Sequence, residues 1–230
     1  REDTLIHVYP TTVDTVSRGE RSQSYISQHY NSMEDFMARS YDGLIISGAN
    51  PSQADMTQES FWNPLIEVME WGEQHTHSIL CSCLATHALM KAKYGINRQL
   101  KDAKSWGVFP HELINPEHPL VKDITGGLQG PHSHYYDLPI NEIEQTNLQI
   151  LALNQDAGFF LASTPEADLV LFQGHPEYDD KSLMKEYERE IKNFLTGLRS
   201  DYPNPPKNYF SVEIEDRLEQ VKANILQTQE

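Results

Sequence analysis

Apolar and β-branched runs recur along the chain, and stretches with helical periodicity separate them. Such runs are typical of strands that are buried on both faces of a sheet. Strands are expected at 4–10, 42–50, 77–83, 148–154 and 167–175. Helices are expected at 21–39, 58–71, 84–94, 181–198 and 214–227. Because strands and helices alternate, the sequence predicts an α/β fold with a mostly parallel sheet flanked by helices.

The length of the chain favours a single domain. Its 230 residues suffice for one sizeable α/β domain, which we expect to span 1–230. A Pro-rich turn or linker at 201–209 precedes the last predicted helix.

Chemically suggestive residues follow three of the predicted strands. SGAN (47–50) ends one strand, Cys83 ends another, and GHPEYD (174–179) follows a third. In parallel sheets, functional groups gather at the carboxyl ends of the strands. The sequence therefore predicts an active site at this edge of the sheet.

The charge balance excludes some classes of partner. The chain has 18 basic and 34 acidic residues, a formal net charge of −16. Such acidity argues against a nucleic-acid or anionic-membrane surface, so small-molecule substrates are expected. No apolar run approaches the roughly 18 residues that a membrane span needs, and no secretion signal is visible. Cys81 and Cys83 lie too close in sequence for a disulfide, which favours a reducing cytoplasm.

Cys83 has the sequence context of a nucleophile. It lies where a predicted strand turns into a predicted helix, an elbow that holds a side chain exposed. The backbone N–H of Leu84 can then help to bind an oxyanion, and the helix N-terminus favours the thiolate. The alternative is an inert buried cysteine, the commonest state of a free thiol.

His175 and Glu177 could complete a catalytic triad with Cys83. Pro176 fixes the backbone between them, just beyond a predicted strand. The imidazole would take the thiol proton, and the carboxylate would orient the ring. A histidine at a strand end can also be purely structural, so the triad stays a hypothesis on these residues alone.

Several further motifs appear in a specific order and spacing. They are YDGLIISGAN (41–50), FWNPLIEVMEW (61–71), YGI (94–96), KSWGVF (104–109), PHSHY (131–135), GHPEYD (174–179), EYERE (186–190) and PKNYF (206–210). Together they make the chain similar to the homoserine O-succinyltransferase and O-acetyltransferase family. That family shares its fold with the class I glutamine amidotransferases.

The resemblance implies acyl transfer by a ping-pong route. Cys83 would attack the thioester of acetyl-CoA or succinyl-CoA and hold the acyl group. The backbone N–H groups of Ala49 and Leu84 would form the oxyanion hole. His175 would act as the base, and Glu177 would orient it. No metal and no permanently bound cofactor are implied, and a homodimer is expected.

The resemblance also suggests residues that bind the amino-acid acceptor, most simply L-homoserine on the route to methionine. Arg189 would bind its carboxylate and Glu186 its amino group. Lys104 and Ser133 match substrate-binding positions. Without the family these four residues would be assigned to surface ion pairs and turn chemistry.

Some positions depart from the family pattern. Ser52 stands at the acyl-specificity position, where Gly or Glu is usual, so the donor stays open. His87 replaces a Gln beside the nucleophile. His134 replaces an Arg, which leaves L-serine open as the acceptor. The chain also begins at the family's second strand, so the first strand and helix are expected to be missing.

Two other functions stay open on the sequence. One is glutamine amidotransfer or hydrolysis by the same triad, although Cys81 and Ala85 stand where that family prefers Gly. The other is a non-catalytic module that has kept the fold.

Overall fold

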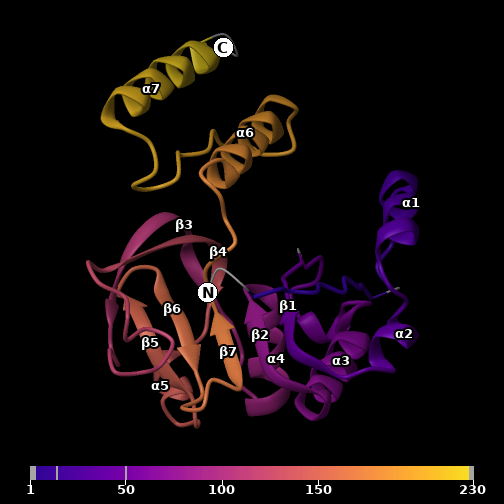
Figure 1. Ribbon diagram of the computed structural model, residues 1–230. Coiled ribbons are helices and arrows are strands. Elements are labelled where there is room, and N and C mark those ends of the chain that lie inside the picture. Colours follow the sequence, from indigo (N-terminus) through magenta and orange to yellow (C-terminus); the bar gives the residue numbers. More distant parts are fainter. Residues whose placement is uncertain (1–3, 14, 50, 228–230) are drawn as a thin grey trace.

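The computed structural model describes residues 4–13, 15–49 and 51–227 (Figure 1). Its helices are α1 (Glu20–His29), α2 (Met33–Met37), α3 (Trp62–His75), α4 (Leu84–Tyr94), α5 (Ile140–Ile143), α6 (Ser182–Leu195) and α7 (Val212–Gln227), with one 3-10 turn, η1 (Met56–Gln58). Its strands are β1 (Tyr41–Ile46), β2 (Thr76–Ser82), β3 (Gln99–Leu113), β4 (Leu128–Asp137), β5 (Gln149–Asn154), β6 (Gly158–Ser163) and β7 (Leu169–Phe172).

These strands form one sheet in the order β1-β2-β7-β6-β5-β3-β4. β1, β2 and β7 are parallel, and the pairings from β7 through β6, β5 and β3 to β4 are antiparallel. The predicted α/β class is confirmed. The three parallel strands are the ones whose carboxyl ends carry the candidate residues, so those residues meet at one edge.

Buried apolar side chains explain why the parallel strands formed as predicted. Val68 and Trp71 of α3 and Leu89 of α4 share one core with Ile79 of β2 and Leu171 of β7. α3 and α4 lie side by side over this part of the sheet (Figure 1). A strand made of continuous apolar residues needs helices packed on it to bury those residues.

Two predicted elements are wrong. Residues 4–10 form no strand, and Leu5, Ile6 and Val8 are 77–78% exposed. An apolar run becomes a strand only where a neighbouring strand pairs with it and a layer covers it. The predicted helix at 21–39 is divided into α1 and α2 because Ser32, in an extended conformation, caps α2 by accepting from Asp35 N.

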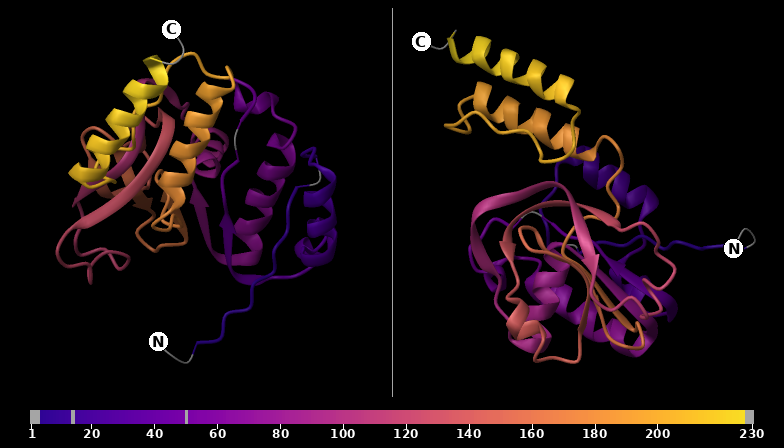
Figure 2. Two further views of the ribbon diagram at one scale, coloured as in Figure 1. Left: turned by 90° about the horizontal axis from the view of Figure 1, so that it is seen from above. Right: turned by 90° about the vertical axis from the view of Figure 1, so that its left-hand side faces the viewer.

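The long β3–β4 hairpin and β6 were not predicted. β3 contains Lys, Asp and Pro and only a short apolar run at 106–109, because one of its faces is largely exposed. Its contacts explain where the C-terminal part of the chain lies. Trp106 of β3 packs with Leu183 and Tyr187 of α6, and Leu218 of α7 joins this cluster. Two views show α6 and α7 side by side above the sheet (Figure 2).

Candidate active site

A sharp turn presents Cys83 between β2 and α4. Its backbone has φ 53° and ψ −114°, a conformation that residues with a side chain rarely adopt. The Cys83 N–H donates to Phe172 O of β7 at 2.8 Å, which fixes the turn to the neighbouring strand. Leu84 begins α4, so its N–H lies at a helix N-terminus. This is the elbow that the sequence predicted.

Close approach of a second loop depends on Gly48. A Cβ at this position would lie 3.1 Å from Leu84 N and 3.3 Å from Cys83 Cβ. Glycine therefore lets the loop after β1 lie against the Cys83–Leu84 peptide. Ala49, the other predicted oxyanion residue, follows directly in this loop.

The two cysteines differ in their surroundings. Cys81 is fully buried within β2, and burial raises its pKa to about 12. It therefore stays a thiol. Cys83 is partly exposed, and neither cysteine is in a disulfide. Only Cys83 combines access with the elbow geometry.

His175 and Glu177 form a pair beside Cys83. His175 Nδ1 lies 2.9 Å from Glu177 Oε1. Ser82 Oγ donates to Glu177 Oε2 at 3.4 Å, which ties the carboxylate to the end of β2. The His175 N–H donates to Pro131 O at 2.9 Å and so anchors the loop to β4.

The imidazole of His175 is held in its protonated form. Burial alone lowers its pKa, but interactions with the Cys83 side chain and with Glu177 outweigh burial and raise the pKa to about 9. At neutral pH the imidazole therefore carries a proton that it can give to a leaving group.

Tyr178 joins this pair to a second polar cluster, and the sequence did not single it out. Its ring stacks on His175 with the ring centroids 4.2 Å apart and 17° between the planes. Its hydroxyl donates to Glu186 Oε1 at 2.5 Å. Its position next to Glu177 in the GHPEYD segment was the sequence feature that could have identified it.

Glu186 is the centre of the second cluster. Ser133 Oγ donates to Glu186 Oε2 at 2.5 Å, and Lys104 Nζ lies 3.5 Å from the same oxygen. Burial raises the pKa of Glu186, but hydrogen bonds from Ser133 and Tyr178 and the charge of Lys104 lower it overall. The structure thus brings together Lys104, Ser133 and Glu186, three residues that are far apart in sequence.

Arg189 lies one turn beyond Glu186 on α6. Its side chain is 57% exposed, and its Nε lies 3.5 Å from Glu190 Oε1. Its charge contributes to the lowered pKa of Glu186. Of the four predicted acceptor-binding residues, it is the most open to solvent.

Three other predicted positions lie away from this cluster. Ser52 is exposed in the loop after β1 and bonds Glu59. His87 is buried, with Nε2 2.9 Å from Gln173 Oε1, so it faces the interior. His134 is also buried, with Nε2 2.9 Å from His132 Nδ1.

Strand alternation explains the place of His134. Successive side chains of a strand point to opposite faces. Ser133 of β4 contacts Glu186, so His132 and His134 point to the other face, into the protein. His134 therefore does not stand at the acceptor cluster, which corrects its expected influence on amino-acid recognition.

Arg98 was also missed by sequence reasoning. It directly precedes β3, and its guanidinium lies 4.0 Å from the centre of the Tyr136 ring. Its Nη2 donates to Ala54 O at 3.1 Å. It is a second positive charge in the neighbourhood of Cys83.

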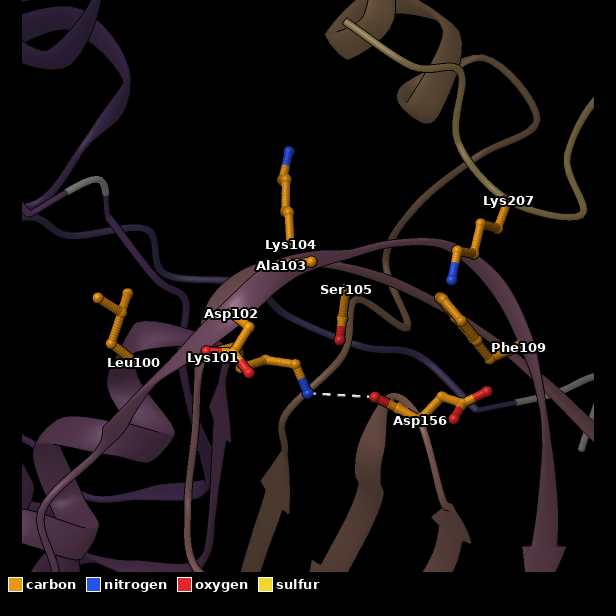
Figure 3. A pocket seen from close by; sticks show the side chains of 9 residues that line it. All are labelled: Leu100, Lys101, Asp102, Ala103, Lys104, Ser105, Phe109, Asp156 and Lys207. Atoms are coloured by element: carbon orange, nitrogen blue, oxygen red, sulfur yellow. Dashed lines mark hydrogen bonds between the residues drawn. The ribbon is translucent and has the colours of Figure 1, made fainter.

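A cavity of about 400 Å³ lies beside the first half of β3 (Figure 3). Lys104 and Lys207 line it, and Lys101 donates across it to Asp156 O at 3.1 Å. Lys101 is also paired with Asp137. The Lys104 side chain, which belongs to the Glu186 cluster, points away from Lys101 and Asp156 (Figure 3).

The described residues contain no group of three or more His, Cys, Asp or Glu side chains arranged to hold a metal ion. None of the helices that they form has the length and apolarity that crossing a bilayer requires.

Comparison with known proteins gives consistent results. The family model described as homoserine O-succinyltransferase matches residues 3–225. A homoserine O-succinyltransferase of Methylococcus capsulatus is 44% identical over 209 residues, 90% of this chain and 59% of that protein. One from Methylobacter tundripaludum is 44% identical over 226 residues, 95% of this chain and 64% of that protein. The chain spans about three fifths of the length of these curated relatives.

Similarity to a solved structure bears on the fold alone. A glutamine amidotransferase from Thermotoga maritima matches with a TM-score of 0.52 at 13% identity, over 96% of each chain. The predicted glutamine-amidotransferase-like fold is confirmed by this likeness.

Proposed function

Because this chain belongs to the homoserine O-succinyltransferase family, we propose that it transfers an acyl group from acyl-CoA to the hydroxyl group of L-homoserine, a step of methionine biosynthesis. The observation that carries the proposal is the strained Cys83 elbow beside the His175–Glu177 pair. A partly exposed cysteine next to a charged imidazole is suited to attack a thioester.

Acylation of the protein is the first half of the proposed reaction. The Cys83 thiolate bonds to the thioester carbonyl carbon, and the N–H groups of Leu84 and Ala49 stabilise the oxyanion. The bond between that carbon and the CoA sulfur then breaks. His175 gives its proton to the departing sulfur, so free CoA leaves as a thiol and the acyl group stays on Cys83.

Transfer to the acceptor is the second half. His175, now neutral, removes the proton from the homoserine hydroxyl, and the oxygen bonds to the acyl carbon. The bond to Cys83 Sγ breaks, and the ester leaves. The thiolate and the imidazolium are both regenerated, so one acyl group has moved with no net change in the protein.

Glu186 and Arg189 account for the choice of an amino acid. They lie three residues apart on α6 and so share a helix face. A carboxylate and a guanidinium together complement the ammonium and carboxylate of a zwitterion. Neutralising either by Glu186→Gln or Arg189→Gln should raise KM for homoserine and leave KM for the acyl donor nearly constant.

The direct test is product formation by the protein mixed with succinyl-CoA and L-homoserine. We expect succinyl-CoA alone to release at most about one equivalent of CoA thiol per protein, from the acylation of Cys83. Continuous release should require both substrates and should be accompanied by O-succinylhomoserine in the mass spectrum. L-Serine should be the poorer acceptor, since one methylene changes discrimination about 10–200-fold. Ammonia released from L-glutamine, without acyl transfer, would contradict the proposal and favour an amidotransferase-like hydrolase.

A further inference from the structure

Arg98 is a partly buried cation without a direct acidic partner. Among the described residues no carboxylate lies within ion-pair distance of it, and its Nη2 donates a hydrogen bond to the Ala54 carbonyl. A guanidinium carries five N–H donors in a planar fork. The Tyr136 ring covers one face of that fork at 4.0 Å. Donors at its edge therefore stay available for a ligand.

The loop that accepts the hydrogen bond from Arg98 also lies against the nucleophile elbow. Ala54 lies in the loop that follows β1, and this loop lies against the Cys83–Leu84 peptide at Gly48. A cation fixed to this loop faces the same region as the elbow.

Tyr136, whose ring covers the other side of Arg98, is linked to the same elbow by hydrogen bonds. Gln173 Nε2 donates to Tyr136 O at 2.9 Å, and Gln173 Oε1 lies 2.9 Å from His87 Nε2. His87 belongs to the first turn of α4, and its N–H donates to Cys83 O at 3.3 Å. Arg98 is therefore held between Ala54 and Tyr136, and hydrogen bonds link Tyr136 to the nucleophile through Gln173 and His87.

Electrostatics agree with this geometry. Burial lowers the pKa of Arg98, and the charges of Tyr136, Glu59, Asp55 and Cys83 act in the opposite direction without cancelling the effect of burial. The guanidinium is thus incompletely compensated, and a further anion would stabilise it.

The acceptor cluster has cations of its own. Lys104 and Arg189 act on Glu186, which Tyr178 links to His175. No hydrogen bond or ion pair joins Arg98 to these residues in the described structure, and it donates instead to Ala54 in the loop after β1. Lys104 and Arg189 are thus available for a carboxylate on the acceptor, and Arg98 is available for a different carboxylate, on the donor.

We propose that Arg98 binds the terminal carboxylate of a dicarboxylic acyl group as that group is transferred to Cys83, and so selects succinyl-CoA over acetyl-CoA. The inference rests on the acyl transfer proposed above. Arginine suits the task because its fork binds a carboxylate through two parallel hydrogen bonds. An acetyl group offers no such partner, so its transfer would gain nothing from Arg98.

The test compares kcat/KM for succinyl-CoA and acetyl-CoA in the native protein, in Arg98→Gln and in Arg98→Lys. Native protein should prefer succinyl-CoA. Arg98→Gln should lower kcat/KM for succinyl-CoA by about 100-fold, the usual scale for removing one member of a hydrogen-bonded charge pair. The loss for acetyl-CoA should stay within about threefold. Arg98→Lys keeps the charge and should retain part of the preference.

Arg21→Gln is the matched control, because Arg21 is an exposed arginine on α1 and the change in net charge is the same. An equal loss for both donors in Arg98→Gln would overturn the inference and reduce Arg98 to a support of the loop. A raised KM for homoserine at a constant donor ratio would also overturn it. If native protein transfers neither acyl group, the proposed function fails instead.

Discussion

At the scale of single residues, the site depends on strain at Cys83 and on charge at His175. A positive φ at a residue with a side chain costs of order 1–3 kcal/mol. Here the turn is held by the Phe172 carbonyl on one side and by α4 on the other. Glu177 contributes to the raised pKa of His175, so the carboxylate supports the protonated imidazole.

The first prediction concerns the pH dependence of acylation. His175 must be protonated to give its proton to the CoA sulfur, and its pKa is raised to about 9. The rate of acylation should therefore fall as pH rises through about 9. Glu177→Gln removes one stabilising charge, so the fall should move to lower pH while the fold persists. Single-turnover rates across pH would measure both; an unshifted profile in Glu177→Gln would mean that the carboxylate is only structural.

At the scale of elements, the sequence identified the strands that carry the site and missed those that surround it. β2 and β7 are largely buried and β1 buries Leu44 and Ile46, and all three strands contain continuous apolar runs that the sequence shows. β3 and β4 form a hairpin with polar residues on one face, so their sequences resemble those of loops. Residues 4–10 have the apolar pattern of a strand but no paired neighbour among the described residues.

A single glycine determines how the C-terminal segment lies on β3. Gly107 has φ 142°, and a Cβ there would lie 2.2 Å from Lys207 O. Lys207 N donates to Trp106 O, and Val108 N donates to Lys207 O, both at 2.9 Å. The two segments can therefore pair only if position 107 has no side chain.

Gly107→Ala should break this pairing and lower the free energy of unfolding by about 1–3 kcal/mol. Urea denaturation would measure the loss. Gly43→Ala is the control, since a Cβ there meets only ordinary contacts at 3.7 Å. Equal stability of the two variants would refute the close approach at Gly107.

At the scale of the whole molecule, buried neutral histidines make the fold sensitive to acid. Burial lowers the pKa of His132 to about 2, of His134 to about 3 and of His87 to about 4. Charges around them, including Lys101 and Arg98, act in the same direction. Sequence reasoning found His87 and His134 as departures from the family pattern but could not find their burial, which depends on strand alternation and on the partner Gln173.

Stability should therefore decrease as pH falls below about 6.5, the ordinary pKa of histidine in an unfolded chain. In that range the unfolded chain binds protons that the folded chain excludes, at up to about 1.4 kcal/mol per pH unit for each histidine. His175 adds nothing there, because it is protonated in both states. Urea unfolding at about pH 7 and about pH 5 would show the loss.

His87→Gln removes one of these titrating groups and keeps a side chain that can donate to Gln173. The number of protons taken up on unfolding, which sets the slope of stability against pH, should decrease by about one. A slope identical to that of the native protein would show that His87 is not among the groups responsible.

The most direct test of the central claim is the intact mass of the protein after mixing with succinyl-CoA in the absence of acceptor. We predict a gain of one succinyl group, mapped by peptide analysis to Cys83, lost when L-homoserine is added. Cys83→Ala should abolish the gain. Cys81→Ala should leave most of it, because Cys81 is buried. A gain that survives in Cys83→Ala, or that maps to Cys81, would contradict the account.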